Sequence, residues 1–199
     1  MIDTHGRKYV QPGFDKGANL LIKLGLTPIK VTFIALIIGI VSIVFLLLGE
    51  LIGAVILLWI SGIFDVLDGT VARKTHKESE LGAFLDITFD RILELGIIVS
   101  LAIINPNLRL MLVILTASIV MSLTIFLTVS SFAKNNGKKA FYYQAGIAER
   151  TEGFIFFTLM ILWGDMRMLI GYIFVFAVLF TAIQRFFEGV RILKDKKNG

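Results

Sequence analysis

The chain has 199 residues, of which 56% are hydrophobic, and its mean hydropathy is +0.84. A soluble domain of this length would be far more polar, so the composition excludes an ordinary soluble protein and indicates one integral membrane domain, residues 1–199. The chain has no cysteine, which excludes disulfides and thiolate metal sites, and its net charge of +5 requires no nucleic-acid partner.

The N-terminal segment, residues 1–27, lacks the apolar core of a signal peptide, so we expect the first span to direct insertion. Within this segment Phe14, Ala18, Leu21 and Ile22 recur at helical spacing, with charged residues between them. The pattern predicts a short amphipathic juxtamembrane helix on the membrane surface, and an ordinary polar leader is the alternative.

Apolar segments follow, each near the roughly 20 residues that a helix needs to cross a bilayer. They lie at 29–48, 51–72, 82–104, 108–132, 149–164 and 168–190. Lipid tolerates only helices and closed barrels, and these segments lack the alternating polarity of barrel strands. The sequence therefore predicts an all-α fold, a six-helix transmembrane bundle preceded by the amphipathic surface helix.

The basic residues predict an orientation. Of the 20 Lys and Arg residues, 15 lie in the N-terminal segment, the 73–77 loop, the 134–150 segment and the C-terminal tail, and Lys30 lies at the start of the first apolar segment on the same side. Six spans place all of these segments on one side, and the positive-inside rule makes that side cytoplasmic. We therefore expect a multi-pass protein of the cell membrane with both termini in the cytoplasm.

Four aspartates lie at or inside the ends of the second and third apolar segments. Asp65 and Asp68 are three residues apart, which leaves them about 60° apart around a helix, and Asp86 and Asp90 are about 40° apart. A short loop joins the two segments, so their helices are expected to be antiparallel neighbours. The two pairs of acids can then face each other at a similar depth, next to the cytoplasmic loop.

Each acid is expensive in a membrane, at about 2.5–3.5 kcal/mol near the centre on insertion scales, and four like charges also repel. A divalent cation removes both problems. An all-oxygen site suits Mg²⁺ or Mn²⁺ better than Zn²⁺, and four carboxylates can hold two ions that bridge a diphosphate. The alternative is that the acids pair with Arg73, Arg91 and nearby lysines at a wet helix end.

Small and basic residues lie between the acids. Gly69 and Gly82 allow backbone or ligand to approach closely, and Arg73 offers a planar fork suited to phosphate. Packing is the alternative role for each glycine, because membrane helices favour glycine at their contacts. Glu94, one turn beyond Asp90, is expected to orient Arg91 or another basic side chain.

The complete spacing is Asp65-x2-Asp68-Gly69-x2-Ala72-Arg73-x8-Gly82-x3-Asp86-x3-Asp90. It resembles the full signature of the CDP-alcohol phosphotransferases. The resemblance implies a six-helix, homodimeric membrane enzyme of phospholipid biosynthesis. Such an enzyme uses two Mg²⁺ or Mn²⁺ ions to transfer a phosphatidyl-type group from a CDP-linked lipid, such as CDP-diacylglycerol, to an alcohol, with release of CMP.

The resemblance also implies roles for these positions. Three aspartates would be metal ligands, and Asp90 would be a further ligand and the base that deprotonates the acceptor hydroxyl. The ligand set is then Asp65, Asp68, Asp86 and Asp90. The CDP site would be lined by Asp68, Gly69, Ala72, Arg73 and Gly82.

Three further stretches, GLTPIKVT (25–32), GIAERTE (146–152) and QR (184–185), are similar to the phosphatidylinositol-phosphate and archaetidylinositol-phosphate synthases. In that branch basic residues hold the acceptor's phosphate, and the matching positions are Lys134, Arg150 and Arg185. The run AKNNGKKAFYYQ (133–144) departs from the Lys-Ala-Arg-Ala-Glu-like run of the branch.

Two arginines and a lysine favour a phosphate dianion over a neutral alcohol. We therefore expect a soluble phosphorylated acceptor, and serine, inositol or choline is the alternative. Snorkelling and interface anchoring are the alternative roles of Arg185 and Arg150.

Three other classes of membrane protein also bury acids. An ion transporter with a carboxylate site does not explain Gly69, Ala72 and Arg73 at fixed offsets, and no broken helices in paired halves are evident. An intramembrane aspartyl protease would need a Gly-x-Gly-Asp motif, which is absent. A prenyltransferase with Asp-rich metal sites usually needs more spans.

Overall fold

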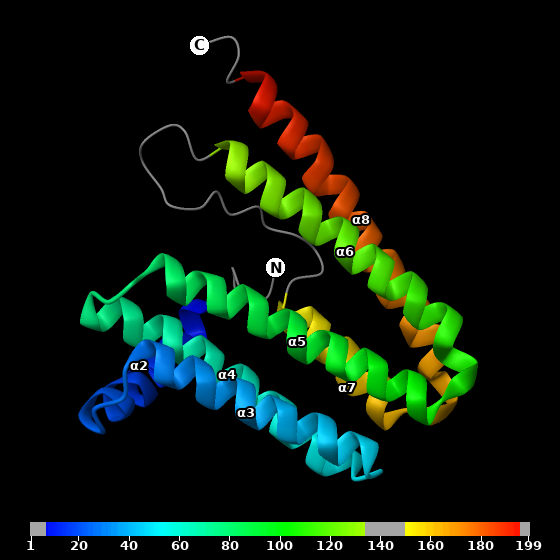
Figure 1. Ribbon diagram of the computed structural model, residues 1–199, viewed down its shortest axis with the longest axis horizontal. Coiled ribbons are helices and arrows are strands. Elements are labelled where there is room, and N and C mark those ends of the chain that lie inside the picture. The colour runs from blue at the N-terminus through cyan, green and yellow to red at the C-terminus, as the bar shows by residue number, and fades with distance from the viewer. Residues whose placement is uncertain (1–6, 134–149, 196–199) are drawn as a thin grey trace. The chain divides into compact units, whose positions relative to one another are not determined.

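The computed structural model describes residues 7–133 and 150–195, and in these ranges every regular element is helical (Figure 1). The α-helices are α2 (Arg7–Lys23), α3 (Pro28–Leu47), α4 (Leu51–Thr75), α5 (Glu80–Ile104), α6 (Arg109–Ala133), α7 (Arg150–Leu162) and α8 (Arg167–Asp195). Short 3-10 turns at Pro106–Leu108 and Gly164–Met166 precede α6 and α8. The predicted all-α fold is confirmed for the described part of the chain.

Each of the apolar segments predicted from the sequence forms a helix, but not all of these helices meet the requirements of a membrane span. The described stretches that are long and apolar enough are Pro28–Leu47, Leu51–Thr75, Pro106–Phe132 and Gly164–Lys194. α5 does not qualify because Asp90, Arg91 and Glu94 interrupt its apolar part. α7 has 13 residues, and a helix of that length is about 20 Å long, shorter than the roughly 30 Å hydrocarbon core. The protein is therefore a multi-pass membrane protein, and six spans remain a prediction.

The chain forms two compact units, which we describe separately. The first unit contains α2 to α5, and the second contains α6 to α8. The four aspartates belong to the first unit, and Arg150 and Arg185 belong to the second.

In the first unit α3 packs against both α4 and α5. α4 runs antiparallel to α3: Ser61 Oγ donates to Ala35 O at 2.7 Å, and Ser42 Oγ donates to Ala54 O at 2.7 Å. Small side chains permit this close approach, and such contacts matter because helices in lipid gain little from the hydrophobic effect.

α5 runs parallel to α3 on another side. The Phe33 and Phe89 rings meet edge to face, with centroids 5.1 Å apart. One turn and a half further on, a Cβ placed on Gly39 would lie 2.5 Å from Leu93 Cδ2 and 3.0 Å from Ser61 Oγ. Gly39 is therefore where all three helices converge, and α3 sets the positions of the two helices that carry the aspartates.

α2 is amphipathic, as the sequence predicts, and its apolar face packs on α4. Ala18 and Leu21 of α2 form a buried cluster with Leu67 and Val71 of α4 and with Val31 at the start of α3. The structure thus gives this face a protein partner, and the location of α2 on the membrane surface remains a prediction.

In the second unit α6 and α8 run parallel and lie side by side (Figure 1). α7 runs back along α8, where the Phe156 ring stacks on the buried Phe174 ring at 4.7 Å. Arg167 closes the turn between them, because its Nε and Nη2 donate to Met160 O at 2.6 Å and Ile161 O at 3.0 Å. These bonds satisfy carbonyl groups that the C-terminus of α7 would otherwise leave unpaired.

Candidate metal centre and surrounding basic residues

A short connection, residues 76–79, brings the ends of α4 and α5 together. α4 ends where His76 adopts the left-handed conformation, with φ 52°. The N–H of Lys77 then donates to Ala72 O at 2.9 Å and that of His76 to Arg73 O at 3.3 Å, which is the Schellman pattern of helix termination. α5 begins with Ser79, whose Oγ accepts from the N–H of Gly82 at 3.0 Å.

Three of the four predicted aspartates come together between these two helices. Asp65 and Asp68 of α4 are buried, with 9% and 8% of their surface exposed, and Asp86 of α5 is half-buried. One carboxylate oxygen from each lies within 4.8 Å of the other two. Asp90, one turn further along α5 and half-buried, is not part of this group of three.

The separation of these oxygens suits a single small cation. Oxygens on opposite sides of a Mg²⁺ ion lie about 4.2 Å apart, twice the roughly 2.1 Å metal–oxygen distance. The oxygens of Asp65, Asp68 and Asp86, all within 4.8 Å of one another, need only small side-chain movements to reach such an ion. Carboxylates alone provide the hard oxygen donors that Mg²⁺ and Mn²⁺ prefer.

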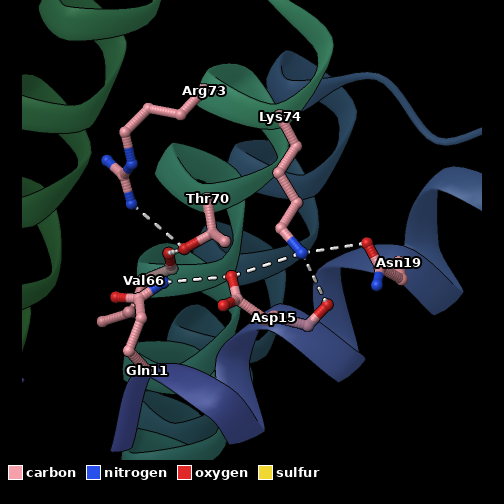
Figure 2. Close-up of polar contacts among 7 residues, drawn as sticks. All are labelled: Gln11, Asp15, Asn19, Val66, Thr70, Arg73 and Lys74. Carbon is pink, nitrogen blue, oxygen red and sulfur yellow. Dashed lines mark hydrogen bonds and ion pairs between the residues drawn. The ribbon is translucent and has the colours of Figure 1, made fainter. Parts of the chain in front are cut away.

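Arg73, in the last turns of α4, lies against its own helix. Its Nη2 donates to Thr70 Oγ1 at 3.1 Å, and Thr70 Oγ1 in turn donates to Val66 O at 2.9 Å (Figure 2). A Cβ placed on Gly69 would lie 3.3 Å from Arg73 Nη1, so glycine leaves room for the guanidinium there. Thr70 is buried, and it holds the end of an otherwise exposed arginine.

The remaining signature residues lie close to the helix ends. Ala72 is half-buried in the last turns of α4, and Gly82 is half-buried in the first turn of α5. A Cβ on Gly82 would lie 3.2 Å from Ser79 Oγ, so glycine there also protects the helix cap. Beyond Asp90, Arg91 forms an ion pair with Glu94, which confirms that Glu94 orients Arg91.

In the second unit the predicted acceptor residues lie against aromatic rings. Arg185 of α8 is half-buried; its Nη1 donates to Ser122 Oγ of α6 at 3.3 Å, and its Cζ lies 5.1 Å from the centroid of Phe126. Arg150 lies over its neighbour Phe154, with Cζ 5.6 Å from the ring centroid. Both are favourable cation–π distances. Lys134 lies outside the described residues.

A second polar group on α4 was not predicted from the sequence. Lys74 Nζ lies 3.3 Å from Asp15 Oδ1 of α2, and it donates hydrogen bonds to Asp15 O at 3.1 Å and to Asn19 Oδ1 at 3.0 Å (Figure 2). Gln11 Nε2, also on α2, donates to Asp15 Oδ1 at 3.1 Å. We call these four residues the Lys74 clamp. Its long sequence separation hides it from pattern analysis, whereas Thr70 could have been found from its position one turn before Arg73.

Comparison with known proteins places this geometry in a family. The family model described as CDP-alcohol phosphatidyltransferase matches residues 26–183, which include the complete signature. The phosphatidylinositol phosphate synthase of Corynebacterium glutamicum is 40% identical over 94 residues, which cover 46% of this chain and 42% of that protein. The archaetidylinositol phosphate synthase of Pyrococcus horikoshii is 34% identical over 97 residues, or 49% of this chain and 52% of that protein. The matched region thus spans about half the length of these relatives.

A more extended match is the Escherichia coli inner membrane protein YnjF, 29% identical over 169 residues that cover 80% of this chain and 81% of that protein. Among solved structures, the phosphatidylinositol phosphate synthase of Mycobacterium tuberculosis in complex with manganese and citrate has a TM-score of 0.69 and 22% identity, covering 88% of each chain. The same protein with CDP-DAG bound has a TM-score of 0.67, also at 22% identity, and covers 86% of this chain and 90% of that chain. At this identity the likeness shows the fold. With the signature and most of the chain matched by the family model, the protein belongs to the CDP-alcohol phosphatidyltransferase family, whose members are transferases.

Proposed function

We propose that this protein synthesises a phospholipid by transferring a phosphatidyl-type group from a CDP-linked lipid to a soluble alcohol, with release of CMP. The observation that carries the proposal is the approach of the Asp65, Asp68 and Asp86 oxygens to within 4.8 Å of one another, inside the family signature. Family membership supports the reaction type, and the cluster supports the proposal that the reaction takes place between α4 and α5.

In the proposed reaction the acceptor oxygen attacks the phosphorus that carries the lipid. The new P–O bond forms as the bond to the bridging diphosphate oxygen breaks, and CMP leaves with that oxygen. The hydroxyl proton passes to Asp90, which is half-buried one turn beyond Asp86. Two Mg²⁺ or Mn²⁺ ions would neutralise the diphosphate charge.

The residues of this chain bind and orient the donor. Asp65, Asp68 and Asp86 would hold the ions, with Asp90 as a further ligand, and Asp68 would also face the nucleotide. Gly69, Ala72, Arg73 and Gly82 would line the CDP site. The bond from Arg73 to Thr70 supports this role, because it holds the guanidinium beside Gly69 before a phosphate arrives.

The donor is a CDP-linked lipid of the diacylglycerol or archaeol type. One solved relative has CDP-DAG bound, and other relatives are named as archaetidylinositol phosphate synthases. We propose that the acceptor is phosphorylated, an inositol phosphate or a glycerol phosphate ahead of serine or choline. Arg150 and Arg185 support this choice, as does the naming of relatives as phosphatidylinositol phosphate synthases.

A CMP-release assay in detergent tests the proposed function. Purified protein with CDP-diacylglycerol or CDP-archaeol and Mn²⁺ should release CMP when an inositol phosphate or glycerol phosphate is added. EDTA should stop the reaction, and Mg²⁺ or Mn²⁺ should restore it. Absence of CMP release with every donor, acceptor and metal in the screen would contradict the reaction. Activity with a free alcohol and none with its phosphate would contradict the proposed acceptor.

We also propose that the site opens to the cytoplasmic side of the cell membrane and that the protein is a homodimer. The orientation is supported by the exposed basic residues Arg73 and Lys74 in the last turn of α4 and Lys77 in the connection that follows, next to the acid cluster. A cysteine introduced by Lys77→Cys should react with an impermeant thiol reagent in inverted vesicles only. Labelling in right-side-out vesicles would reverse the orientation, and a monomeric mass in detergent and in crosslinked membranes would contradict the dimer.

A further inference from the structure

The last two turns of α4, which carry Gly69, Ala72 and Arg73, extend past the helix that supports the rest of α4. The pairs Ser42–Ala54 and Ala35–Ser61 fix the antiparallel register of α3 and α4. If this register continues toward the N-terminus of α3, Asp68 of α4 lies opposite Pro28, the first residue of α3. Beyond Asp68 the α4 backbone therefore needs support from another element.

α2 supplies this support through close apolar contacts. Leu67 and Val71 of α4 pack on Ala18 and Leu21 of α2 in the buried cluster. A Cβ placed on Gly17 would lie 3.0 Å from Leu67 Cδ2, so the two helices approach closely at that point. These contacts hold α2 against α4, but as apolar contacts they are not directional.

The Lys74 clamp adds directional contacts at the end of α4. The Lys74 ammonium group has three donors, and three oxygens on α2 surround it: Asp15 Oδ1 at 3.3 Å, Asp15 O at 3.1 Å and Asn19 Oδ1 at 3.0 Å. The side chains of Lys74 and Asp15 are 30% and 40% exposed, and ion pairs with such exposure contribute little to global stability. Their defined geometry points to a role in orientation.

Arg73 and Lys74 are adjacent residues, so their side chains leave α4 in directions about 100° apart. Figure 2 shows the result: Arg73 turns to Thr70, while Lys74 turns the other way to Asp15 and Asn19 of α2. We propose that Lys74 is a positioning residue that fixes the rotation of the last turns of α4, and thereby the direction in which Arg73 meets the diphosphate of the donor. This inference rests on the proposed function.

The test compares Lys74→Met with Lys77→Met. Both variants remove one positive charge near the site, but Lys77 lies in the exposed connection after α4 and is not a member of the Lys74 clamp. Lys74→Met should raise KM for the CDP-lipid by about fivefold or more and leave KM for the acceptor within about twofold. It should also reduce the rise in unfolding temperature that CDP gives in the presence of Mn²⁺. Lys77→Met should change neither quantity.

Two results would overturn the inference. The first is a donor KM for Lys74→Met equal to that of Lys77→Met in a protein that releases CMP normally. The second is an equal loss toward both substrates together with a lower unfolding temperature without ligand, which would make Lys74 merely structural. If the wild-type protein releases no CMP from any CDP-lipid, the proposed function itself fails, so the two failures are distinguishable.

Discussion

The acids of the first unit and the arginines of the second are both set in apolar helices, but they are held in different ways. Asp65, Asp68 and Asp86 converge from two helices, with oxygens within 4.8 Å of one another. Arg185 instead lies against Ser122 and Phe126 of one neighbouring helix. Converging like charges favour a bound cation, whereas a guanidinium on a hydroxyl and an aromatic face is stabilised locally. The acid cluster therefore indicates a ligand by its own geometry, and the arginine site depends more on comparison with relatives.

The largest effect should come from neutralising one of the converging acids. Asp65→Asn, Asp68→Asn and Asp86→Asn should each lower the rate of CMP release by about 100-fold or more, because each removes a negative charge from the proposed metal site. A factor of 100 corresponds to a loss of about 2.7 kcal/mol of transition-state stabilisation. Asp165→Asn, an exposed acid in the turn before α8, is the matched control and should leave the rate unchanged. Wild-type rates in all three cluster variants would remove the basis for a metal site.

Arg185 should show a smaller effect that is selective for one substrate. Arg185→Gln should raise KM for the phosphorylated acceptor about tenfold, or 1.4 kcal/mol. It should leave KM for the CDP-lipid nearly constant, because we propose that Arg73 and the acid cluster hold the donor. Arg191→Gln, an exposed arginine further along α8, provides the control in the same steady-state assay. Equal losses toward both substrates would show that the contacts of Arg185 with α6 are purely structural.

The close packing of the first unit predicts a stability effect. Gly39→Ala should lower the unfolding temperature in detergent, with a loss of about 1–3 kcal/mol, because the added Cβ would meet Leu93 Cδ2 at 2.5 Å. Gly13→Ala on α2 is the control, since a Cβ there has nothing within 4 Å. Equal unfolding temperatures for the two variants would mean that α3, α4 and α5 are less closely packed than described.

The smallest effect concerns the pH dependence of the Lys74 clamp. Hydrogen bonds from Gln11 and then from Lys74 hold the pKa of the Asp15 carboxyl below its usual value of 3.8. A carboxyl whose pKa is lower in the folded state stabilises the fold above its unfolded pKa, and this contribution is lost as the pH falls through the folded pKa. The free energy of unfolding should therefore fall more for the wild type than for Asp15→Asn as the pH is lowered from about 5 to about 3. It is measured by thermal unfolding that reverses on cooling. Parallel pH curves would show that the clamp does not form.

Much of the fold could be predicted, because long apolar runs in a membrane protein must be helices and their ends carry turn and cap residues such as Ser79 and His76. The convergence of Asp65, Asp68 and Asp86 could be predicted as well, since helical spacing and a short connection leave few other arrangements. The count of six spans stays a prediction, because charged residues interrupt the apolar part of α5 and α7 is short for a membrane span.

Other features depend on contacts between segments that are distant in the chain. The ion pair between Lys74 and Asp15 follows from the docking of α2 on α4, which no local pattern specifies. The direction in which Arg185 turns likewise follows from the packing of α8 on α6, which brings Ser122 and Phe126 beside it. Sequence spacing could identify Arg185 as a cation in an apolar helix but could not identify its neighbours.

The most direct test of the acid cluster is Mn²⁺ binding, measured by electron paramagnetic resonance on purified protein without any lipid substrate. The wild type should bind Mn²⁺. Asp68→Asn should weaken binding strongly, and Asp90→Asn should weaken it less, because Asp90 is outside the group of three oxygens. Asp165→Asn should bind like the wild type. Equal Mn²⁺ affinity in the wild type and Asp68→Asn would contradict the proposal that these carboxylates hold the catalytic metal.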